Sequence, residues 1–301
     1  MTIEAIECRD RDEWLVERSN TIGASDVAAI LGLNKWATPL AVWAQRTGRM
    51  APKPETEGMR LGKKMEPIIE ALYREETGRE TENLGDFTIH RNTDMPLIHA
   101  TLDRRILRER DSLGTHGVLE LKNVGVRLAD HWEDAVPLYV QCQIQAQLAA
   151  TGLMWGSAAA LIGGQQFVWK DVPRSQPFIE FMYVKIEAFA MCVRNNVEPD
   201  VGEHDLDTIK AIYPDVAEAK TLALPVDEGA ALMEAIRKAR AECTKYEKVK
   251  KAAETRIRQL MGDAQIGTLP DGSCFKRTIS HVKETKLREY DRDVLTIKGT
   301  K

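Results

Sequence analysis

The stretch Gly117–Asn123, with the sequence GVLELKN, decides the fold of this chain of 301 residues. Its side chains alternate in character, which is typical of a β-strand, where successive residues point to opposite faces of the sheet. Leu119 and Leu121 are therefore predicted to face a core, while Glu120 and Lys122 share the other face. The pattern places a carboxylate beside an ammonium group on a buried sheet.

A second carboxylate belongs to Asp103, which follows the strand-like run LIHATL. A hairpin or meander would bring it close to Glu120. Two carboxylates and a lysine suit a Mg²⁺ site that cleaves phosphodiesters, because Mg²⁺ takes few protein ligands, all oxygens, and keeps waters. The metal and Lys122 can then act on a water and on the phosphate. The alternative is a surface salt bridge, since Glu-x-Lys is a common pattern.

The composition is that of an ordinary globular protein, with 43% hydrophobic and 29% charged residues. The length suits one large domain, or one domain with an appendage. The net charge is −4, but residues 237–301 hold 17 Lys and Arg against 9 Asp and Glu, a balance of +8 that leaves −12 elsewhere. This basic segment indicates a polyanion or an acidic partner, or else a solvated helix face.

The five cysteines are far apart, and none are spaced as Cys-x-x-Cys. This argues against a disulfide framework, a zinc ribbon or an iron–sulfur cluster, and favours a reducing compartment. No apolar run reaches transmembrane length, and the N-terminal residues lack the core of a signal peptide. We expect a soluble cytoplasmic protein that does not enter a membrane.

Two short helices are predicted near the N-terminus, at residues 25–31 and 38–45, the first of them capped by Ser25. Arg18 lies seven residues before Ser25, across a tight glycine turn. An arginine, a hydroxyl and free amides at a helix N-terminus form a candidate phosphate cradle. For Ser25, ordinary capping is the alternative.

A long amphipathic helix is predicted to begin at residue 57 and to end at Gly78. Its inward stripe comprises Met59, Met65, Ile69, Leu72 and Tyr73. Glu66 lies beside this stripe and is a candidate for the same metal site as Asp103 and Glu120. Its alternative role is a charge on the helix surface.

The middle of the chain alternates between strands and helices. The predicted strands are residues 83–91, 96–110, 117–124, 155–164 and 165–172, and the predicted helices are residues 138–152 and 177–195. Residues 111–117 form an exposed hairpin tip, and residues 127–137 a flexible connection. This order predicts a mixed sheet flanked by helices, in the α/β (α+β) class.

The C-terminal third is predicted to begin with an irregular acidic linker at residues 201–226. A long helix at residues 228–261 follows, with residues spaced alternately by four and three: Leu232, Ile236, Ala239, Cys243, Tyr246, Lys250, Ala253, Ile257 and Leu260. Such a heptad seam packs on a partner helix or along the body of the protein. A small hairpin at residues 269–283 comes next, and the last dozen residues are expected to be disordered.

Together these motifs resemble the YqaJ-type viral recombinase family, which is related to phage lambda exonuclease and belongs to the PD-(D/E)XK nuclease superfamily. The resemblance covers about residues 14–200 and rests on the order of RSNTIGASDVAAILG, a Gly-x-x-x-Glu at residues 62–66, ATLD, LELK and VPLYVQCQIQAQLAATG. It implies a restriction-endonuclease-like exonuclease core at residues 1–200, the linker, and a basic helix-and-hairpin appendage at residues 227–301.

The resemblance also implies ligands for Mg²⁺, with Mn²⁺ as an alternative. Asp103 and Glu120 would bind the metal together with the carbonyl of Leu121, Glu66 would assist the metal or the water, and Lys122 would orient the attacking water. The pattern departs from the family in two respects. The second motif is TLD without a flanking proline or glycine, and the interval from Asp103 to Glu120 is longer than in lambda exonuclease.

Other residues match residues of the family that contact the DNA substrate. Gln143 matches the active-site glutamine of the family, with Gln145 and Gln147 as alternatives in register. Arg18 and Ser25 match the pair that grips a terminal 5′ phosphate. Further candidate DNA contacts are Arg60, Lys63, Lys64 and Gln145.

The activity implied is 5′→3′ digestion of one strand of linear double-stranded DNA, which releases 5′-mononucleotides and leaves a 3′ overhang. Relatives of this kind form ring-shaped homotrimers and work with a single-strand annealing protein in phage recombination, so we expect a phage or prophage protein in the bacterial cytoplasm. The alternatives are a restriction-like endonuclease on the same core and a non-catalytic DNA-binding or assembly protein.

Overall fold

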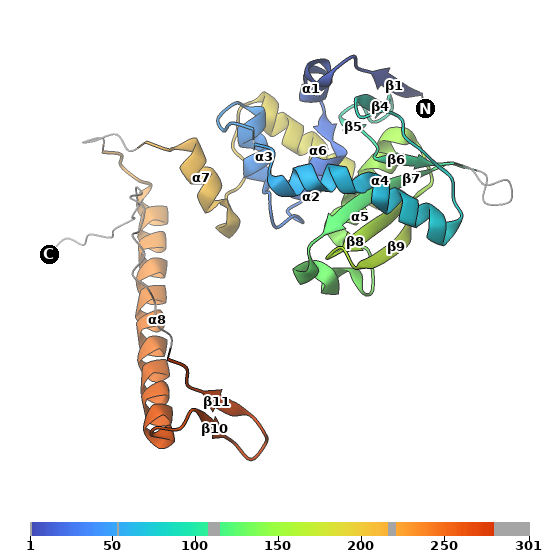
Figure 1. The fold of residues 1–301 in the computed structure, drawn as a ribbon. Helices are drawn as coiled ribbons and strands as arrows, with labels where there is room; N and C mark the ends of the chain where they lie inside the picture. Colours follow the sequence, from blue (N-terminus) through green and yellow to red (C-terminus); the bar gives the residue numbers. More distant parts are fainter. Residues whose placement is uncertain (1, 53, 108–114, 216–220, 280–301) are drawn as a thin grey trace. The chain divides into compact units, whose positions relative to one another are not determined.

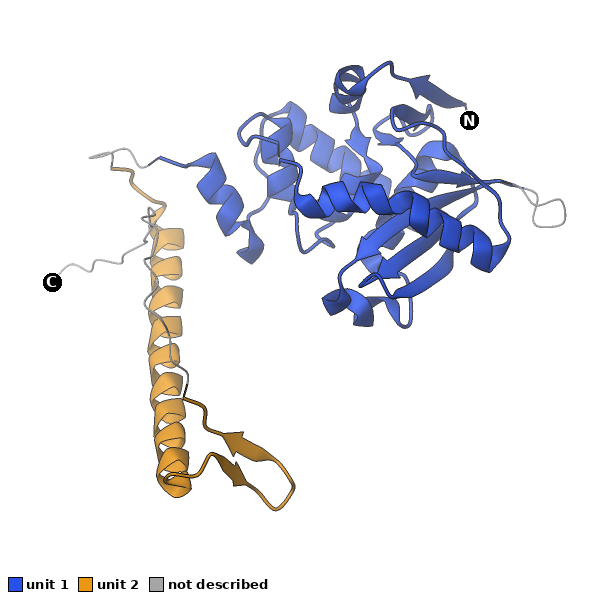
Figure 2. Cartoon of the chain, viewed as in Figure 1, with its two compact units in different colours: residues 1–216 blue, residues 217–301 orange. Residues whose placement is uncertain are grey.

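The computed structural model describes residues 2–52, 54–107, 115–215 and 221–279. The chain divides into two compact units, residues 1–216 and residues 217–301, coloured separately in Figure 2. Each unit is described by itself. Most of the predicted hairpin tip and all of the last dozen residues lie outside the described residues.

The larger sheet of unit 1 holds the stretch that opened the sequence analysis. Its strands, in spatial order, are β3 (Thr81–Glu82), β6 (Arg104–Ile106), β7 (Gly117–Val124), β8 (Trp155–Ile162) and β9 (Gln166–Pro173). Only the β7–β8 pair is parallel, and helix α5 connects these two strands. The mixed sheet and the α/β fold predicted from sequence are confirmed.

The second sheet of unit 1 has four strands, in the order β1 (Ile3–Glu7), β4 (Thr88–Asn92), β5 (Ile98–Ala100) and β2 (Ile22–Gly23). The single strand predicted over residues 96–110 is therefore wrong. The chain forms β5 in this sheet, loses regular structure over residues 101–103, and continues as β6 in the larger sheet. Asp103 lies in that crossing, immediately before β6.

Seven α-helices are described in unit 1 (Figure 1). They are α1 (Arg11–Ser19), α2 (Val27–Ile30), α3 (Pro39–Arg46), α4 (Glu57–Thr77), α5 (Leu138–Thr151), α6 (Gln176–Arg194) and α7 (Leu206–Ile212). Helices α4 and α5 both end at a glycine with positive φ, Gly78 at 69° and Gly152 at 72°. Glycine adopts this left-handed conformation without a steric cost, which explains where both helices stop.

The two faces of β7 pack against different helices. Leu119 and Leu121 belong to the core that contains Ile69 of α4, whereas Val118 belongs to the core that contains Ile144 of α5. The predicted alternation is thus confirmed. Glu120, between Leu119 and Leu121, faces α5 and is only 2% exposed.

Two local predictions are wrong. Met59 was expected to face inward but is 54% exposed, because α4 buries nothing before Ile69. The expected flexible connection contains the 3₁₀ helix η2 (Val126–Trp132), which the fully buried Trp132 anchors.

The predicted linker is also partly ordered. It contains the 3₁₀ helix η3 (Glu203–Asp205) and α7. Buried Asp205 accepts hydrogen bonds from the Thr38 hydroxyl and from the Gly202 amide, the latter at 2.7 Å. These contacts attach residues 202–205 to the rest of unit 1. A run of acidic residues suggested a solvated linker, but one of its carboxylates is a buried cap.

Unit 2 consists of the long helix α8 (Val226–Met261) and an antiparallel hairpin of β10 (Ile266–Thr268) and β11 (Cys274–Lys276). The helix matches its prediction closely, whereas the hairpin begins before the predicted residues 269–283. No residue of α8 is buried. Among the described residues, no helix is long and apolar enough to cross a membrane.

Candidate active site

The candidate active site is built where β6 and β7 run antiparallel. Arg104 pairs with Leu119, so Asp103, one residue before Arg104, comes opposite Glu120, one residue after Leu119. Asp103 Oδ2 accepts a hydrogen bond from the backbone N–H of Leu121 at 2.8 Å. The structure thus brings together the two carboxylates that lie far apart in sequence. Leu121 contacts Asp103 through its amide, and the role expected for its carbonyl stays a prediction.

Two glutamines of α5 hold the Glu120 carboxylate. The Gln143 side-chain amide donates to Oε1 and the Gln147 amide donates to Oε2, each at 2.6 Å. Residues four apart share one face of a helix, which explains why this pair converges on one carboxylate.

Lys122 completes this network. Its ammonium group lies 2.6 Å from Glu120 Oε1 and donates to Gln143 Oε1 at 3.2 Å. Burial lowers the pKa of Lys122, but the nearby carboxylates of Glu120 and Asp103 outweigh this, and the net pKa is raised. Lys122 is therefore a fixed cation at the edge of the site.

The Asp103 carboxyl group is strongly perturbed. Burial and the neighbouring Glu120 charge together raise its pKa well above the ordinary value, against the opposing effect of Lys122. Two carboxylates forced together in a low-dielectric environment resist simultaneous ionisation. A divalent cation between them would remove that repulsion, so the site's electrostatics suit a metal.

Glu66 lies next to Arg104. Its carboxylate is 3.9 Å from the guanidinium of Arg104, whose side chain is only 7% exposed and donates to Glu70 at 2.6 Å. In the described part of the chain, no group of three His, Cys, Asp or Glu side chains could hold a metal ion. Glu66 nevertheless lines the same cavity as Asp103, and its role in assisting the metal or the water stays a prediction.

The remaining donors still fit Mg²⁺ or Mn²⁺. Mg²⁺ is commonly held by one or two carboxylates with water completing its shell, so Asp103 and Glu120 are a sufficient protein contribution. Both are oxygen donors, and the described residues provide neither a sulfur nor an imidazole ligand beside them that would favour a softer metal.

A cavity of about 350 Å³ connects this cluster to the proposed phosphate cradle. The predicted site residues that line it are Arg18, Ser25, Lys63, Glu66, Asp103 and Gln143. Residues from the N-terminal helix region, α4, the sheet crossing and α5 thus share one opening. Ser25 lies inside the 3₁₀ helix η1 (Ala24–Asp26) and makes no capping hydrogen bond, so the capping role expected for it is wrong.

Arg18 is held rigidly at the cavity wall. Its guanidinium lies 4.0 Å from the centre of the Trp14 ring, and its Nε donates to His99 Nε2 at 3.1 Å. His99 Nδ1 lies 2.7 Å from the Thr21 hydroxyl. Burial, assisted by the Arg18 charge, lowers the pKa of His99 to about 3. The imidazole is therefore neutral, so it accepts from Arg18 on one side and donates to Thr21 on the other.

The outer DNA candidates are less closely connected to the cavity. Arg60 is exposed and pairs with Glu57 at 2.8 Å, and Lys64 is exposed on α4. Gln145 points away from the site. Its side-chain amide donates to the Pro173 carbonyl at 2.7 Å and accepts from the Ser175 amide at 2.8 Å. It is buried with both ends engaged, so it is not available to contact DNA.

Sequence reasoning missed several residues that build the site. Gln147 was considered only as an alternative to Gln143, yet both hold Glu120, and their spacing of four was the available signal. Arg104, next to Asp103, and His99 had no pattern that distinguished them. Their roles depend on two sheets meeting, which no local sequence pattern reports.

Known proteins are similar in sequence to this chain. Residues 13–154 match the model of the YqaJ-like viral recombinase domain. The chain is also 29% identical over 296 residues to the uncharacterized protein YqaJ of Bacillus subtilis strain 168, which covers 94% of this chain and 89% of that protein. Residues 13–154 are therefore similar to the YqaJ-like viral recombinase domain.

Two solved structures are similar. One is an alkaline exonuclease, LHK-Exo, from Laribacter hongkongensis, at 18% identity and a TM-score of 0.47, covering 62% of this chain and 94% of that one. The other is LHK-Exo in complex with dAMP, at 18% identity and a TM-score of 0.49, covering 68% of this chain and 98% of that one.

Proposed function

We propose that this protein is a metal-dependent deoxyribonuclease that digests one strand of linear double-stranded DNA in the 5′→3′ direction. The observation that carries the proposal is the cluster of Asp103, Glu120, Lys122 and Gln143 beside a cavity that Arg18 also lines. The match of residues 13–154 to a viral recombinase domain supports DNA as the substrate.

Asp103 and Glu120 would hold Mg²⁺, or alternatively Mn²⁺. When bound, the metal would act as a Lewis acid on the scissile phosphate. Lys122 would donate a hydrogen bond to the attacking water or to the negative charge that develops on the phosphate. Gln143 contacts both Lys122 and Glu120, so it would hold the ammonium group and the carboxylate in fixed positions relative to each other.

Arg18 would bind the terminal 5′ phosphate, with Ser25 as a second donor. The Nε of Arg18 is committed to His99, and no hydrogen bond to another described residue engages its two terminal nitrogens. An arginine that is already oriented loses little side-chain entropy when it binds a phosphate. Lys63, at the same cavity, would add positive charge toward the DNA backbone.

The products would be 5′-mononucleotides and a 3′ overhang suited to a single-strand annealing protein. A homotrimeric ring, for which sedimentation of the free protein is the test, would allow an acidic chain to bind DNA, because basic residues need only line the channel. These steps follow from the family resemblance and remain parts of the proposal.

Digestion of end-labelled linear duplex, in Mg²⁺ and in chelator, tests the proposal. We expect mononucleotide release in Mg²⁺ only, faster from a 5′-phosphorylated end than from a hydroxyl end. Cleavage of covalently closed plasmid would instead indicate the restriction-like endonuclease. Absence of any cleavage, with DNA still bound, would indicate a non-catalytic binding protein.

Lys122→Ala should reduce the cleavage rate by about 100-fold or more, the usual effect of removing one transition-state donor. DNA binding should change little, whereas the melting temperature should fall, because the buried Glu120 carboxylate loses its cation. Lys210→Ala, at an exposed lysine of α7, is the matched control. Cleavage at the wild-type rate by Lys122→Ala would remove the lysine from the mechanism.

A further inference from the structure

Helix α8 carries a row of apolar side chains that no described part of the chain covers. Leu232, Tyr246 and Leu260 are 58%, 64% and 66% exposed. Helices in proteins gain most of their stability by packing one face against a neighbour rather than from intrinsic propensity. A helix of 36 residues with none buried therefore presents a face that is suited to a partner.

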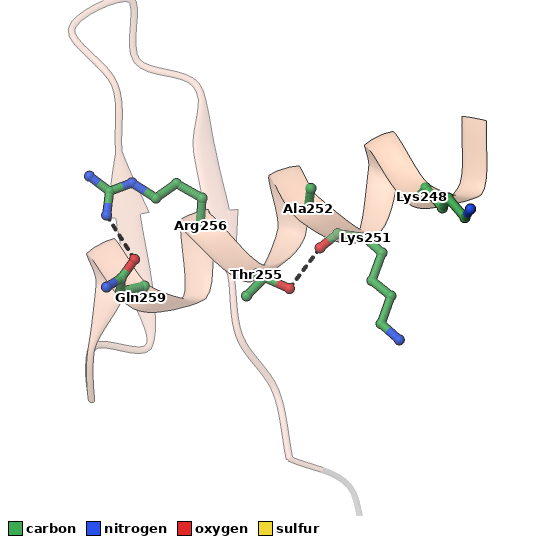
Figure 3. A pocket seen from close by; sticks show the side chains of 6 residues that line it. All are labelled: Lys248, Lys251, Ala252, Thr255, Arg256 and Gln259. Carbon is green, nitrogen blue, oxygen red and sulfur yellow. Dashed lines mark hydrogen bonds between the residues drawn. The ribbon is translucent and has the colours of Figure 1, made fainter. Parts of the chain in front are cut away.

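The row has the spacing of a coiled-coil seam. Its a positions are Ile236, Cys243, Lys250 and Ile257, and its d positions are Leu232, Ala239, Tyr246, Ala253 and Leu260. The polar face is separate. Figure 3 shows a shallow hollow on it, lined by Lys248, Lys251, Ala252, Thr255, Arg256 and Gln259. The apolar seam is thus one continuous surface that runs along the helix.

We propose that α8 pairs with α8 of a second copy of this chain as an antiparallel two-stranded coiled coil. In an antiparallel pair, each a position of one helix meets a d position of the other. The register that matches the seam end to end places Ile236 against Leu260 of the second copy and Cys243 against Ala253 of the second copy. At about 1.5 Å per residue, the seam from Ile236 to Leu260 is about 36 Å long.

The residues at the centre of the seam favour this orientation. In a parallel pair, Lys250 would face Lys250 of the second copy, which places two ammonium groups together in an apolar interface. In the antiparallel register, Lys250 meets Tyr246 of the second copy. Its aliphatic stem can then pack on the ring while the charge lies over the aromatic face or reaches water.

The flanking charges favour the same orientation. The antiparallel register brings Arg240 beside Glu254 of the second copy and Glu242 beside Arg256 of the second copy, and the twofold symmetry repeats both pairs. Glu247 would face Glu247 of the second copy, and this is the one like-charged contact in the antiparallel register. The parallel register would instead place Glu242 beside Glu247 twice and would form no oppositely charged pair. Flanking charges of this kind set the partner and the orientation in coiled coils.

Disulfide trapping in the full-length chain tests the proposal. In a background of Cys8→Ser, Cys192→Ser and Cys274→Ser, the seam keeps Cys243 as its native thiol. Adding Ala253→Cys should give a covalent dimer as the main species after mild oxidation, on a non-reducing gel. Ala252→Cys, one residue away on the polar face, is the matched control and should leave the chain monomeric on the gel.

Other patterns of cross-linking overturn the proposal. Dimer formed through Cys243 alone, at the level seen with Ala253→Cys, would indicate a parallel pair. Absence of cross-linking in every variant would indicate that α8 does not meet a second copy. In both cases the helical circular dichroism of the variants, matched to that of the parent, shows that α8 is intact.

A charge-reversal series adds a second measurement that does not depend on further thiols at the seam. In the Ala253→Cys background, Arg240→Glu should reduce the yield of cross-linked dimer, and adding Glu254→Arg should restore it, because these residues meet in the antiparallel register. Adding Glu247→Arg in place of Glu254→Arg should not restore it. Restoration by Glu247→Arg alone would contradict the register.

Discussion

Gly23 illustrates how one small residue sets the position of a functional one. A Cβ atom at this position would lie 3.0 Å from Nη2 of Arg18 and 3.3 Å from Nε2 of His99. Both distances are tighter than ordinary van der Waals contact, so any larger residue would push the guanidinium along the cavity wall. The glycine is needed here for close approach, not for an unusual backbone conformation.

Gly23→Ala should therefore weaken the preference for 5′-phosphorylated ends several-fold while leaving the carboxylate cluster in place. The ratio of initial rates on phosphorylated and hydroxyl ends measures this. Gly62→Ala is the control, because a Cβ there meets no atom within 4 Å and alanine favours a helix by roughly 1 kcal/mol. An unchanged ratio in Gly23→Ala would argue against Arg18 as the phosphate contact.

Gln147 offers a second test at the scale of a residue. It is buried, and its amide donates to Glu120 Oε2. Gln147→Leu would leave that oxygen without its donor. The free energy of unfolding should therefore fall by about 1–3 kcal/mol, the usual cost of a buried unsatisfied group.

Urea unfolding measures the change, with Gln165→Leu at an exposed turn as the control. A loss of stability no larger than in the control would mean that water or a shifted side chain replaces the Gln147 contact.

At the scale of the element, α5 shows what a sequence can and cannot predict. Its C-terminal end was predictable from the glycine that follows it. The roles of its glutamines were not, because α5 is buried on nearly all sides and has no strong apolar stripe to fix its rotation. Only the packing reveals that Gln143 and Gln147 face Glu120 and that Gln145 faces the start of α6.

Strands β5 and β6 show where a local sequence pattern predicts the wrong structure. Local pattern predicted one long strand over residues 96–110, because its apolar and β-branched residues favour an extended chain. The choice between one sheet and two depends on which neighbours are available, and those neighbours are distant in sequence. The carboxylates could therefore be predicted from sequence, while Arg104, which contacts both Glu66 and Glu70, could not.

The pairing of β8 with β9 carries a pH-dependent contact. Burial raises the pKa of Asp171, but hydrogen bonds from Arg79 and Ser157 outweigh this, and the net pKa falls below its ordinary value of 3.8. Arg79 donates to both carboxylate oxygens, at 2.7 and 2.8 Å. Because the folded pKa is the lower one, the contact stabilises the fold above the unfolded pKa and is lost as pH falls through the folded value.

Asp171→Asn should therefore lower the melting temperature near neutral pH, and the difference from the parent protein should shrink below about pH 4. Thermal melts across this range provide the measurement, with Asp200→Asn at an exposed position for comparison. A difference that is constant with pH would assign the effect to packing and not to the charge.

At the scale of the whole molecule, every residue of the candidate site lies in unit 1. The site draws on both sheets, on α4 and on α5, all of which end before residue 195. The proposed catalytic residues and the proposed α8 pairing thus belong to different units.

A chain that ends after residue 216 should keep Mg²⁺-dependent digestion of linear duplex, measured as nucleotide release per chain. We expect the initial rate to stay within a few-fold of that of the full chain, since no proposed ligand or donor is removed. Loss of all activity in a truncated chain with an unchanged melting profile would show that unit 2 takes part in catalysis or in loading the DNA.

The crossing of the backbone between the two sheets has a mechanical consequence. Asp103 sits on the short irregular segment that leaves one sheet and enters the other, whereas Glu120 is fixed in the middle of a paired strand. A DNA end that presses against the N-terminal sheet would shift the Asp103 carboxylate and leave the Glu120 carboxylate in place. The distance between the two carboxylates that would hold the metal would then depend on which DNA end is bound.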